Sequence, residues 1–349
     1  ILARGVESVQ NMYSSYIIGI GYRNPTAIIT GNVSFSAGNP VKNVLISATP
    51  TGSTLNFGSS LRIPSTTNVA VNRLHKVLTD SLTLQAWVKP ETNFNNDAIT
   101  LYEIRSNVGQ SKYFKVKLGV VNNRTTLTVT IEEPNLGDHI ITLSDYIPNG
   151  EVDNKGADVL VPISNVNGTF THFTAVLRNN VIPEFYINGR LITDAYVAQM
   201  NIILANNATS GTTPPTVVFT SSNIPTRLNT SPSGYPQSWT QFNLGGGKTA
   251  YLDEFRVWET ALTPSQILTD YRRYLKGNEA FLHTYITGNE GTGSYAYDLS
   301  ATGFSFHGND AKLDDATSFG KIIPTNTQLG ILGVTDQYGN FVISAVPYT

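Results

Sequence analysis

The segment 251–258 alternates in a way that predicts a β-strand, because successive side chains of a strand point to opposite faces. The alternation assigns four residues to each face: Leu252, Glu254, Arg256 and Trp258 to one, and Tyr251, Asp253, Phe255 and Val257 to the other. Aromatic or aliphatic groups occur on both faces. We therefore expect a strand that is buried on both sides.

A short amphipathic helix is predicted directly after this strand, at 263–276. Thr263 is a natural N-cap, Pro264 suits the first helical position, and Gln266 completes a capping box. The apolar stripe of this helix consists of Ile267, Leu268, Tyr271 and Leu275. Gly277 is placed to end the helix. No other segment of the chain predicts a helix convincingly.

The remaining periodic segments indicate short strands joined by turns. Residues 114–120 alternate apolar with polar, and so do residues 127–131 after the turn at 122–124. Asn188-Gly189 is a favoured type I′ hairpin signal. Charged residues make up only 14% of the chain, and the 29 glycines and 17 prolines fit many turns. The pattern predicts an all-β fold, and 349 residues suffice for one large sandwich and a smaller unit.

Four segments, taken in order, resemble the sequence signature of laminin-G-like, concanavalin A-like jelly-roll domains. They are Ser53–Gly58 with Leu61–Pro64, Leu82–Pro90, His172–Val176 with Phe185–Arg190, and Tyr251–Trp258 with the helix that follows. The resemblance covers roughly residues 53–276 and implies a concanavalin A-like jelly-roll sandwich. It also implies that His172 is a structural residue that forms hydrogen bonds in the core. Trp87 and Trp258 lie inside the motif strands, and we expect both to be core residues.

The two ends of the chain resemble the two halves of one small module. Ala27–Ser34 and Gly38–Ser47 are similar to the start of a carboxypeptidase-regulatory-like sandwich, and Thr335–Pro347 is similar to its end. The resemblance implies a jelly roll at 51–321 inserted in, or flanked by, a small Greek-key β-sandwich. That sandwich is split between 27–50 and 322–349, after a strand-like segment at 1–26. The alternative is two incomplete modules.

No catalytic constellation is evident in the sequence. Related glucanases carry a Glu-x-Asp-x-x-Glu spacing that places an acid and a nucleophile on one strand face, and this chain lacks it. The five histidines show no metal-binding spacing, and there are no cysteines. A net charge of −2 argues against nucleic acid, and no apolar run approaches the ~20 residues of a membrane span. We therefore expect a protein that is not an enzyme.

A long polar segment, roughly 205–241, contains the best candidates for carbohydrate binding. Tyr235 and Trp239 are the aromatic residues that we expect to stack on a sugar ring. The alternative for Trp239 is a structural role in covering the sandwich edge.

Calcium is the cofactor that the resemblance implies, with Asp253 and Asp298 as candidate ligands. Calcium requires six to eight oxygen ligands, usually carboxylates and backbone carbonyls. For both aspartates the alternative is a hydrogen bond to backbone amides at a strand end.

These observations predict a non-catalytic carbohydrate-binding or adhesion module of a bacterial cell-surface protein. Its partner would be a glycan or a surface protein, and the chain would belong to a longer extracellular multidomain protein, without membrane insertion. The alternative is a structural spacer, or a protein-interaction repeat that binds no small molecule. A divergent glycoside hydrolase is the third hypothesis.

Overall fold

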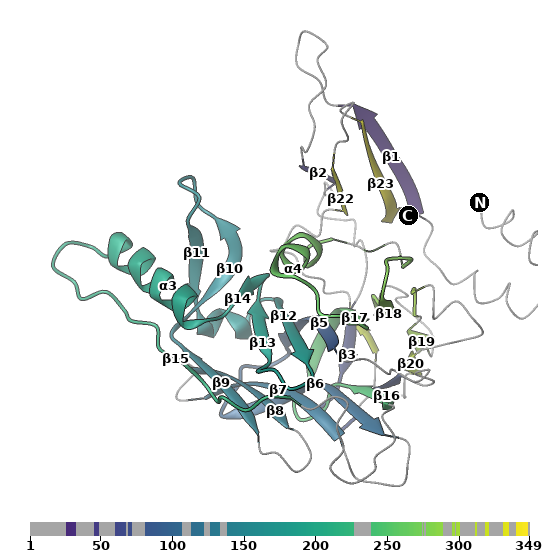
Figure 1. The fold of residues 1–349 in the computed structure, drawn as a ribbon, viewed down its shortest axis with the longest axis horizontal. Coiled ribbons are helices and arrows are strands. Elements are labelled where there is room, and N and C mark those ends of the chain that lie inside the picture. The colour runs from purple at the N-terminus through teal and green to yellow at the C-terminus, as the bar shows by residue number, and fades with distance from the viewer. Residues whose placement is uncertain are drawn as a thin grey trace, which may run out of the picture.

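The computed structural model of the chain describes residues 26–32, 45–48, 60–67, 69–71, 81–106, 113–121, 126–132, 138–226, 239–273, 275, 277–288, 295–296, 298–300, 311–312, 318–320, 331–334 and 340–347. Within these ranges the protein is an all-β jelly-roll sandwich of two large antiparallel sheets (Figure 1). The expected segment 1–26, except for its last residue, and the motif residues 53–58 lie outside the described ranges.

The two sheets bring together strands that are far apart in the sequence. The eight-stranded sheet has the order β14 (Arg190–Leu191), β13 (Glu184–Ile187), β12 (Thr171–Arg178), β5 (Ser81–Pro90), β17 (Ala250–Trp258), β3 (Ser60–Ile63) and β21 (Ser318–Gly320), and β18 (Leu282–Ile286) also pairs with β17. The nine-stranded sheet has the order β15 (Phe219–Ser221), β9 (His139–Ser144), β8 (Thr126–Glu132), β7 (Tyr113–Val121), β6 (Asp97–Ser106), β16 (Trp239–Leu244), β4 (Val69–Val71), β20 (Ala311–Lys312) and β19 (Tyr295–Ala296).

The main core lies between the two sheets and follows the predicted period of two. Its residues from the nine-stranded sheet include Val116, Leu118, Leu127, Val129 and Ile131. Its residues from the eight-stranded sheet include Leu84, Val88, Phe173, Leu252 and Phe255. The hairpin predicted from residues 114–131 is confirmed, because β7 pairs with β8 throughout. Asn188 and Gly189 have φ of 47° and 80°, as a type I′ turn requires.

The strand at 251–258 is buried on both faces, as expected, but its predicted alternation is wrong. The register of β17 against β5 shifts between Asp253 and Arg256, and Glu254 has a φ of 51°. This β-bulge adds one residue, and side chains beyond it switch faces. Leu252 consequently shares the main core with Phe255 and Val257, although the simple alternation had separated them.

The predicted helix is present but shorter than expected. Helix α4 (Pro264–Asp270) has the Thr263–Gln266 capping box, and it ends six residues before the expected 276. Gly277 lies outside it, in a turn where its φ is +86°. The expectation of a single helix is wrong, because α3 (Asp194–Asn207) packs Val197 and Met200 into the main core. A short 3-10 helix, η1 (Ile163–Asn167), is also present.

Replacing Thr263 by alanine is expected to lower the free energy of unfolding by about 1 kcal/mol. The Thr263 hydroxyl accepts the Gln266 N–H, and no alanine side chain can do so. Chemical denaturation would measure the difference. The matched control is Ser265→Ala, an exposed position in the first turn of the same helix, for which we expect a change within about 0.5 kcal/mol. Equal losses in both variants would contradict the role of the cap.

Two further groups of strands lie outside the large sheets. Strands β10 (Tyr146–Val152) and β11 (Asp158–Pro162) form a hairpin that projects from the sandwich (Figure 1). At the ends of the chain, β1 (Thr26–Asn32) pairs with β23 (Asn340–Pro347), and β2 (Leu45–Ala48) pairs with β22 (Ile331–Val334). A split small sandwich requires such pairings. The division into domains stays a prediction.

Candidate binding site

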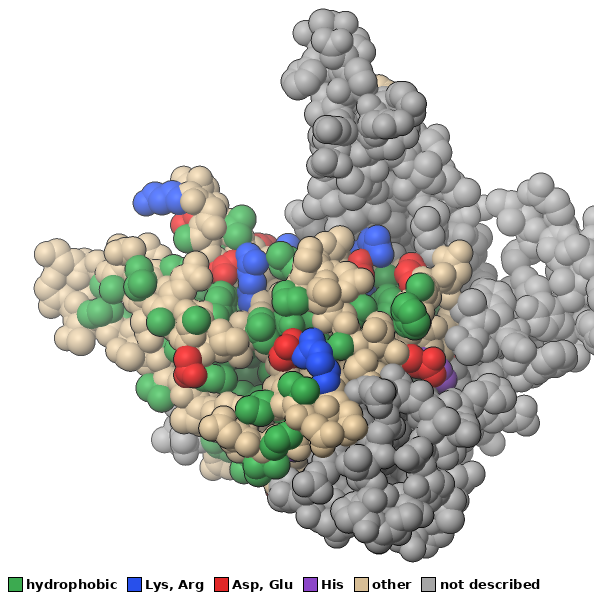
Figure 2. Space-filling model, in the orientation of Figure 1, with side chains coloured by type: hydrophobic (Ala, Val, Ile, Leu, Met, Phe, Trp, Pro, Cys, Tyr) green, Lys and Arg blue, Asp and Glu red, His purple; other side chains and the backbone are tan. Residues whose placement is uncertain are grey.

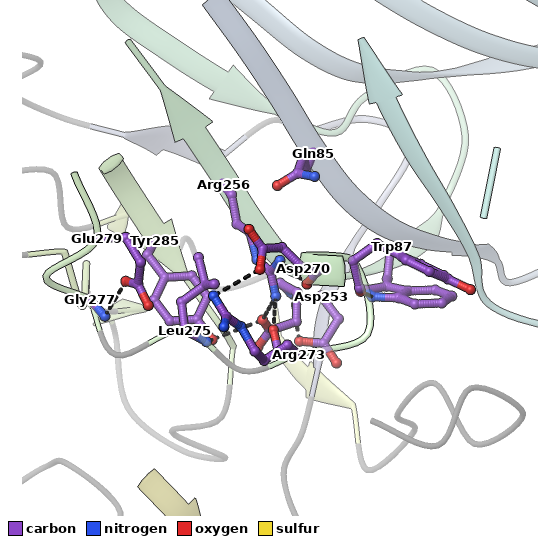
Figure 3. A network of polar contacts seen from close by, with 12 residues as sticks. Gln85, Trp87, Asp253, Arg256, Asp270, Arg273, Leu275, Gly277, Glu279 and Tyr285 are labelled. Atoms are coloured by element: carbon purple, nitrogen blue, oxygen red, sulfur yellow. Dashed lines mark hydrogen bonds and ion pairs between the residues drawn. The ribbon is translucent and has the colours of Figure 1, made fainter. Parts of the chain in front are cut away.

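Arg256 is the centre of a buried polar network on the side of β17 that α4 covers (Figure 3). Its guanidinium is fully buried and donates to Glu254 Oε2 at 2.6 Å, to the Asp270 carbonyl at 2.7 Å, and to the Arg273 carbonyl. The last carbonyl groups of a helix have no partner within the helix. The Asp270 carbonyl is the last one of α4, so Arg256 supplies a hydrogen-bond partner at the C-terminus of this helix.

Glu254 balances the charge of Arg256 and links the network to β18. The Tyr285 hydroxyl donates to Glu254 Oε2 at 2.8 Å, and the Leu275 N–H donates to the Tyr285 oxygen at 3.1 Å. Burial raises the pKa of the Glu254 carboxyl, and Arg256 opposes this shift. Both side chains of the pair are 0% exposed, so the pair is shielded from any dissolved substrate. Its role is structural.

A second buried cluster consists of Trp87, His172 and Tyr271. The His172 ring lies edge-on to Trp87 with centroids 5.0 Å apart, and the Trp87 indole N–H donates to the Tyr271 carbonyl at 3.1 Å. The expected burial of Trp87 and Trp258 is confirmed, at 0% and 3% exposure.

His172 lies in the core, as the resemblance implied, but the expected core hydrogen bonding is wrong for its ring, which is held by packing. Its backbone N–H donates to Asn188 Oδ1 at 2.8 Å, whereas neither ring nitrogen has a hydrogen-bond partner among the described residues. Burial, together with the charge of Arg256, holds the pKa of this imidazole well below its ordinary value of 6.5. The ring is therefore neutral at physiological pH.

The two candidate calcium ligands both accept hydrogen bonds from the backbone. Asp253 Oδ1 accepts the Glu254 N–H at 2.8 Å, and Asp298 Oδ1 accepts the Tyr285 and Ser300 N–H groups at 2.8 and 2.9 Å. Both residues are buried. Within the described part of the chain, no three His, Cys, Asp or Glu residues gather in a group that could hold a metal. Two carboxylates cannot supply all of the oxygens that calcium requires, so other groups would have to complete the site. Calcium binding by Asp253 and Asp298 stays a prediction.

The outward side of the nine-stranded sheet carries a set of polar side chains that we call the polar face. The polar face consists of Glu103, Lys115, Lys117, Thr128, Thr130, Glu132 and Asn243, which alternate with core residues along β6, β7, β8 and β16. Its charges are paired: Lys117 with Glu132, and Lys115 with Glu103 at 3.0 Å. Glu103 and Asn243 are buried, whereas the lysines and threonines of β7 and β8 are partly exposed.

The structure places one of the two candidate aromatic residues relative to this face. Trp239 is the first residue of β16 and pairs with Ser106 of β6, so its backbone belongs to the sheet that carries the polar face. Its side chain and the whole of Tyr235 lie outside the described residues. Sugar binding by Tyr235 and Trp239 stays a prediction.

The face seen in Figure 2 is mainly uncharged where the structure describes it. Hydrophobic side chains are scattered there among polar groups, and several acidic and basic side chains lie close to one another. In the described part of the chain, no helix is both long enough and apolar enough to cross a membrane.

Comparison with known proteins identifies similarity of structure only. No protein-family model matches the chain, and no curated protein matches its sequence. A heptameric SAP-like pentraxin from Limulus polyphemus is similar over 77% of this chain and 97% of its own, with 12% identity and a TM-score of 0.42. A protein from Bacteroides ovatus to which carbohydrate binding is attributed is similar over 84% of this chain and 68% of its own, with 12% identity and a TM-score of 0.40.

A third similar structure is the CBM40 domain of a Ruminococcus gnavus sialidase, which was solved with α2,3-sialyllactose. It covers 60% of this chain and 94% of its own, with 10% identity and a TM-score of 0.30. At TM-scores below 0.5, none of these similarities bears on a ligand or a site of this chain. The chain itself is an all-β jelly-roll sandwich.

Proposed function

We propose that this chain is a non-catalytic carbohydrate-binding or adhesion module of a bacterial cell-surface protein, built on a laminin-G-like jelly roll. The polar face is the observation that supports this proposal. Its threonine hydroxyls and the Lys117–Glu132 pair are partly exposed on one regular sheet, where they can exchange hydrogen bonds with sugar hydroxyls. Trp239 begins a strand of the same sheet and is the proposed stacking residue, together with Tyr235.

The use of the acidic residues supports a function without catalysis. Glycoside hydrolysis requires two carboxyl groups that flank the bond to be cleaved. In β17 the Glu254 carboxylate is bound by Arg256 and Tyr285, and Asp253 accepts a backbone N–H. These groups hold the sandwich together and are closed to a substrate.

A glycan-array screen tests the proposal, run once with calcium and once with a chelator. We expect the chain to bind one class of glycan and Trp239→Ala to weaken that binding, because the stacking ring is removed. The control Ile202→Ala, on the 61% exposed outer side of α3, should bind normally. Loss of binding in chelator, matched by loss in Asp298→Asn, would support the calcium site. No binding in either condition, with a normal circular dichroism spectrum, would contradict the proposal and favour the spacer alternative.

A further inference from the structure

Phe281 occupies a turn position that glycine or asparagine normally takes. The Leu282 N–H donates to the Glu279 carbonyl at 3.2 Å, which closes a four-residue turn before β18. Phe281 is the third residue of this turn and has a φ of +65°. Turns with a positive φ at the third position favour glycine or asparagine, because a bulky side chain is strained there.

The Phe281 ring gains no burial in return for this strain. It is 66% exposed, the largest value among the exposed large hydrophobic residues of the described chain. Neither the backbone nor the core therefore accounts for a phenylalanine at this position. Residues that break a local rule without a structural benefit are found most often at functional sites.

Glu259, whose backbone is hydrogen-bonded to that of Phe281, carries a partly exposed carboxylate. The Glu259 N–H donates to the Phe281 carbonyl at 2.8 Å, and the Glu259 side chain is 38% exposed. Glu259 Oε1 lies 3.8 Å from Nε2 of the buried His283. Partial burial raises the pKa of the Glu259 carboxyl. The solvent-exposed ring of Phe281 and the partly hydrated carboxylate of Glu259 thus belong to two residues joined by a backbone hydrogen bond.

This combination matches the chemistry of a sugar ring. The C–H groups on one face of a pyranose pack on an aromatic ring, and its hydroxyls donate to a carboxylate. The location differs from that of the predicted aromatic site, because Phe281 and Glu259 flank paired strands β18 and β17 of the eight-stranded sheet, whereas Trp239 belongs to the nine-stranded sheet.

We propose that Phe281 and Glu259 form a sugar-binding site at the start of β18, with Phe281 as the stacking platform and Glu259 as the acceptor for sugar hydroxyls. The inference rests on the proposed carbohydrate-binding function and adds to it a second site with its own residues. The ligand is a pyranose with an accessible apolar face.

The test is to compare Phe281→Gly and Phe281→Trp with the parent chain, by calorimetric titration with the glycan that binds best on the array. Phe281→Gly should keep or raise the melting temperature, because glycine adopts the positive φ without strain. It should weaken binding about tenfold, the equivalent of one aromatic stacking contact. Phe281→Trp should retain binding, and Glu259→Gln should weaken it less than Phe281→Gly does.

The outcomes separate this inference from the proposed function. If the parent chain binds a glycan and Phe281→Gly binds it equally well, the Phe281 site is wrong and the proposed function stands. If the parent chain binds no glycan, both are overturned. Weaker binding by Phe281→Gly with an unchanged melting temperature, and normal binding by Ile202→Ala, supports the site.

Discussion

Replacing Arg256 by leucine is expected to lower the free energy of unfolding by about 3–5 kcal/mol, the usual cost of leaving a buried charge without its partner. The loss has two sources. Glu254 would remain fully buried without its counter-ion, and the carbonyls of Asp270 and Arg273 would each lose the hydrogen bond that the Arg256 guanidinium donates. Urea denaturation followed by circular dichroism would measure the change.

The matched control for this prediction is Arg62→Leu. Arg62 forms a two-bonded ion pair with Glu91, at 2.6 and 2.7 Å, but its side chain is 33% exposed. An ion pair in contact with water contributes about 0–1 kcal/mol. Similar losses of unfolding free energy in the two variants would show that burial does not make the Arg256–Glu254 pair more stabilising than an exposed pair.

Acidification below pH 6.5 is expected to destabilise the protein through His172. The pKa of the buried imidazole lies well below 6.5 in the folded chain, so the unfolded chain takes up the proton first. The contribution of His172 to the free energy of unfolding is therefore fully present above pH 6.5. It is lost as the pH drops toward the folded-state pKa. The slope for one such group is about 1.4 kcal/mol per pH unit.

The contribution of His172 is isolated by comparing the parent chain with His172→Phe. Phenylalanine keeps an aromatic ring against Trp87 and Tyr271 and has no proton to bind. We expect the stability of the parent chain relative to the variant to decline between pH 6.5 and 5, and to be constant between pH 7 and 8. Denaturation curves at each pH would show this. Parallel stability profiles for the two chains would rule out His172 as the cause.

Strand positions were predictable because burial imposes a period of two directly on the sequence. The bulge in β17 was not, because the residue that it adds leaves no mark on the pattern: Asp253 and Glu254 are both compatible with regular alternation. The early end of α4 was also hidden, since the apolar stripe continues to Tyr271 and Leu275, whereas the Asp270 carbonyl at the helix end binds Arg256, fourteen positions before it in the sequence.

Helix α3 was missed for a different reason. Its apolar residues do not form a single stripe, since Met200 is buried while Ile202 is 61% exposed. A local signal was available, because Thr193 caps the helix by accepting the Tyr196 N–H at 3.1 Å, and Asp194 follows it in the first turn. Attention to caps as well as to periodicity would have identified this helix.

The candidate site was only partly accessible from the sequence. Aromatic residues in a polar segment can be recognised by composition, and this led to Tyr235 and Trp239. Phe281 could not be selected in this way, because its significance lies in a positive φ and an exposed ring, and neither property can be read from neighbouring residues.

The pairing of β1 with β23 has a mechanical consequence. The strands are antiparallel, with Thr26 beside Pro347 and Asn32 beside Asn340. Tension that pulls residues 26 and 347 apart would load the hydrogen bonds of this pair one after another from that end, in an unzipping geometry. The sandwich strands between residues 60 and 320 would carry no load until this pair and then the β2–β22 pair had opened. The strand pair would thus open first and shield the sandwich from force.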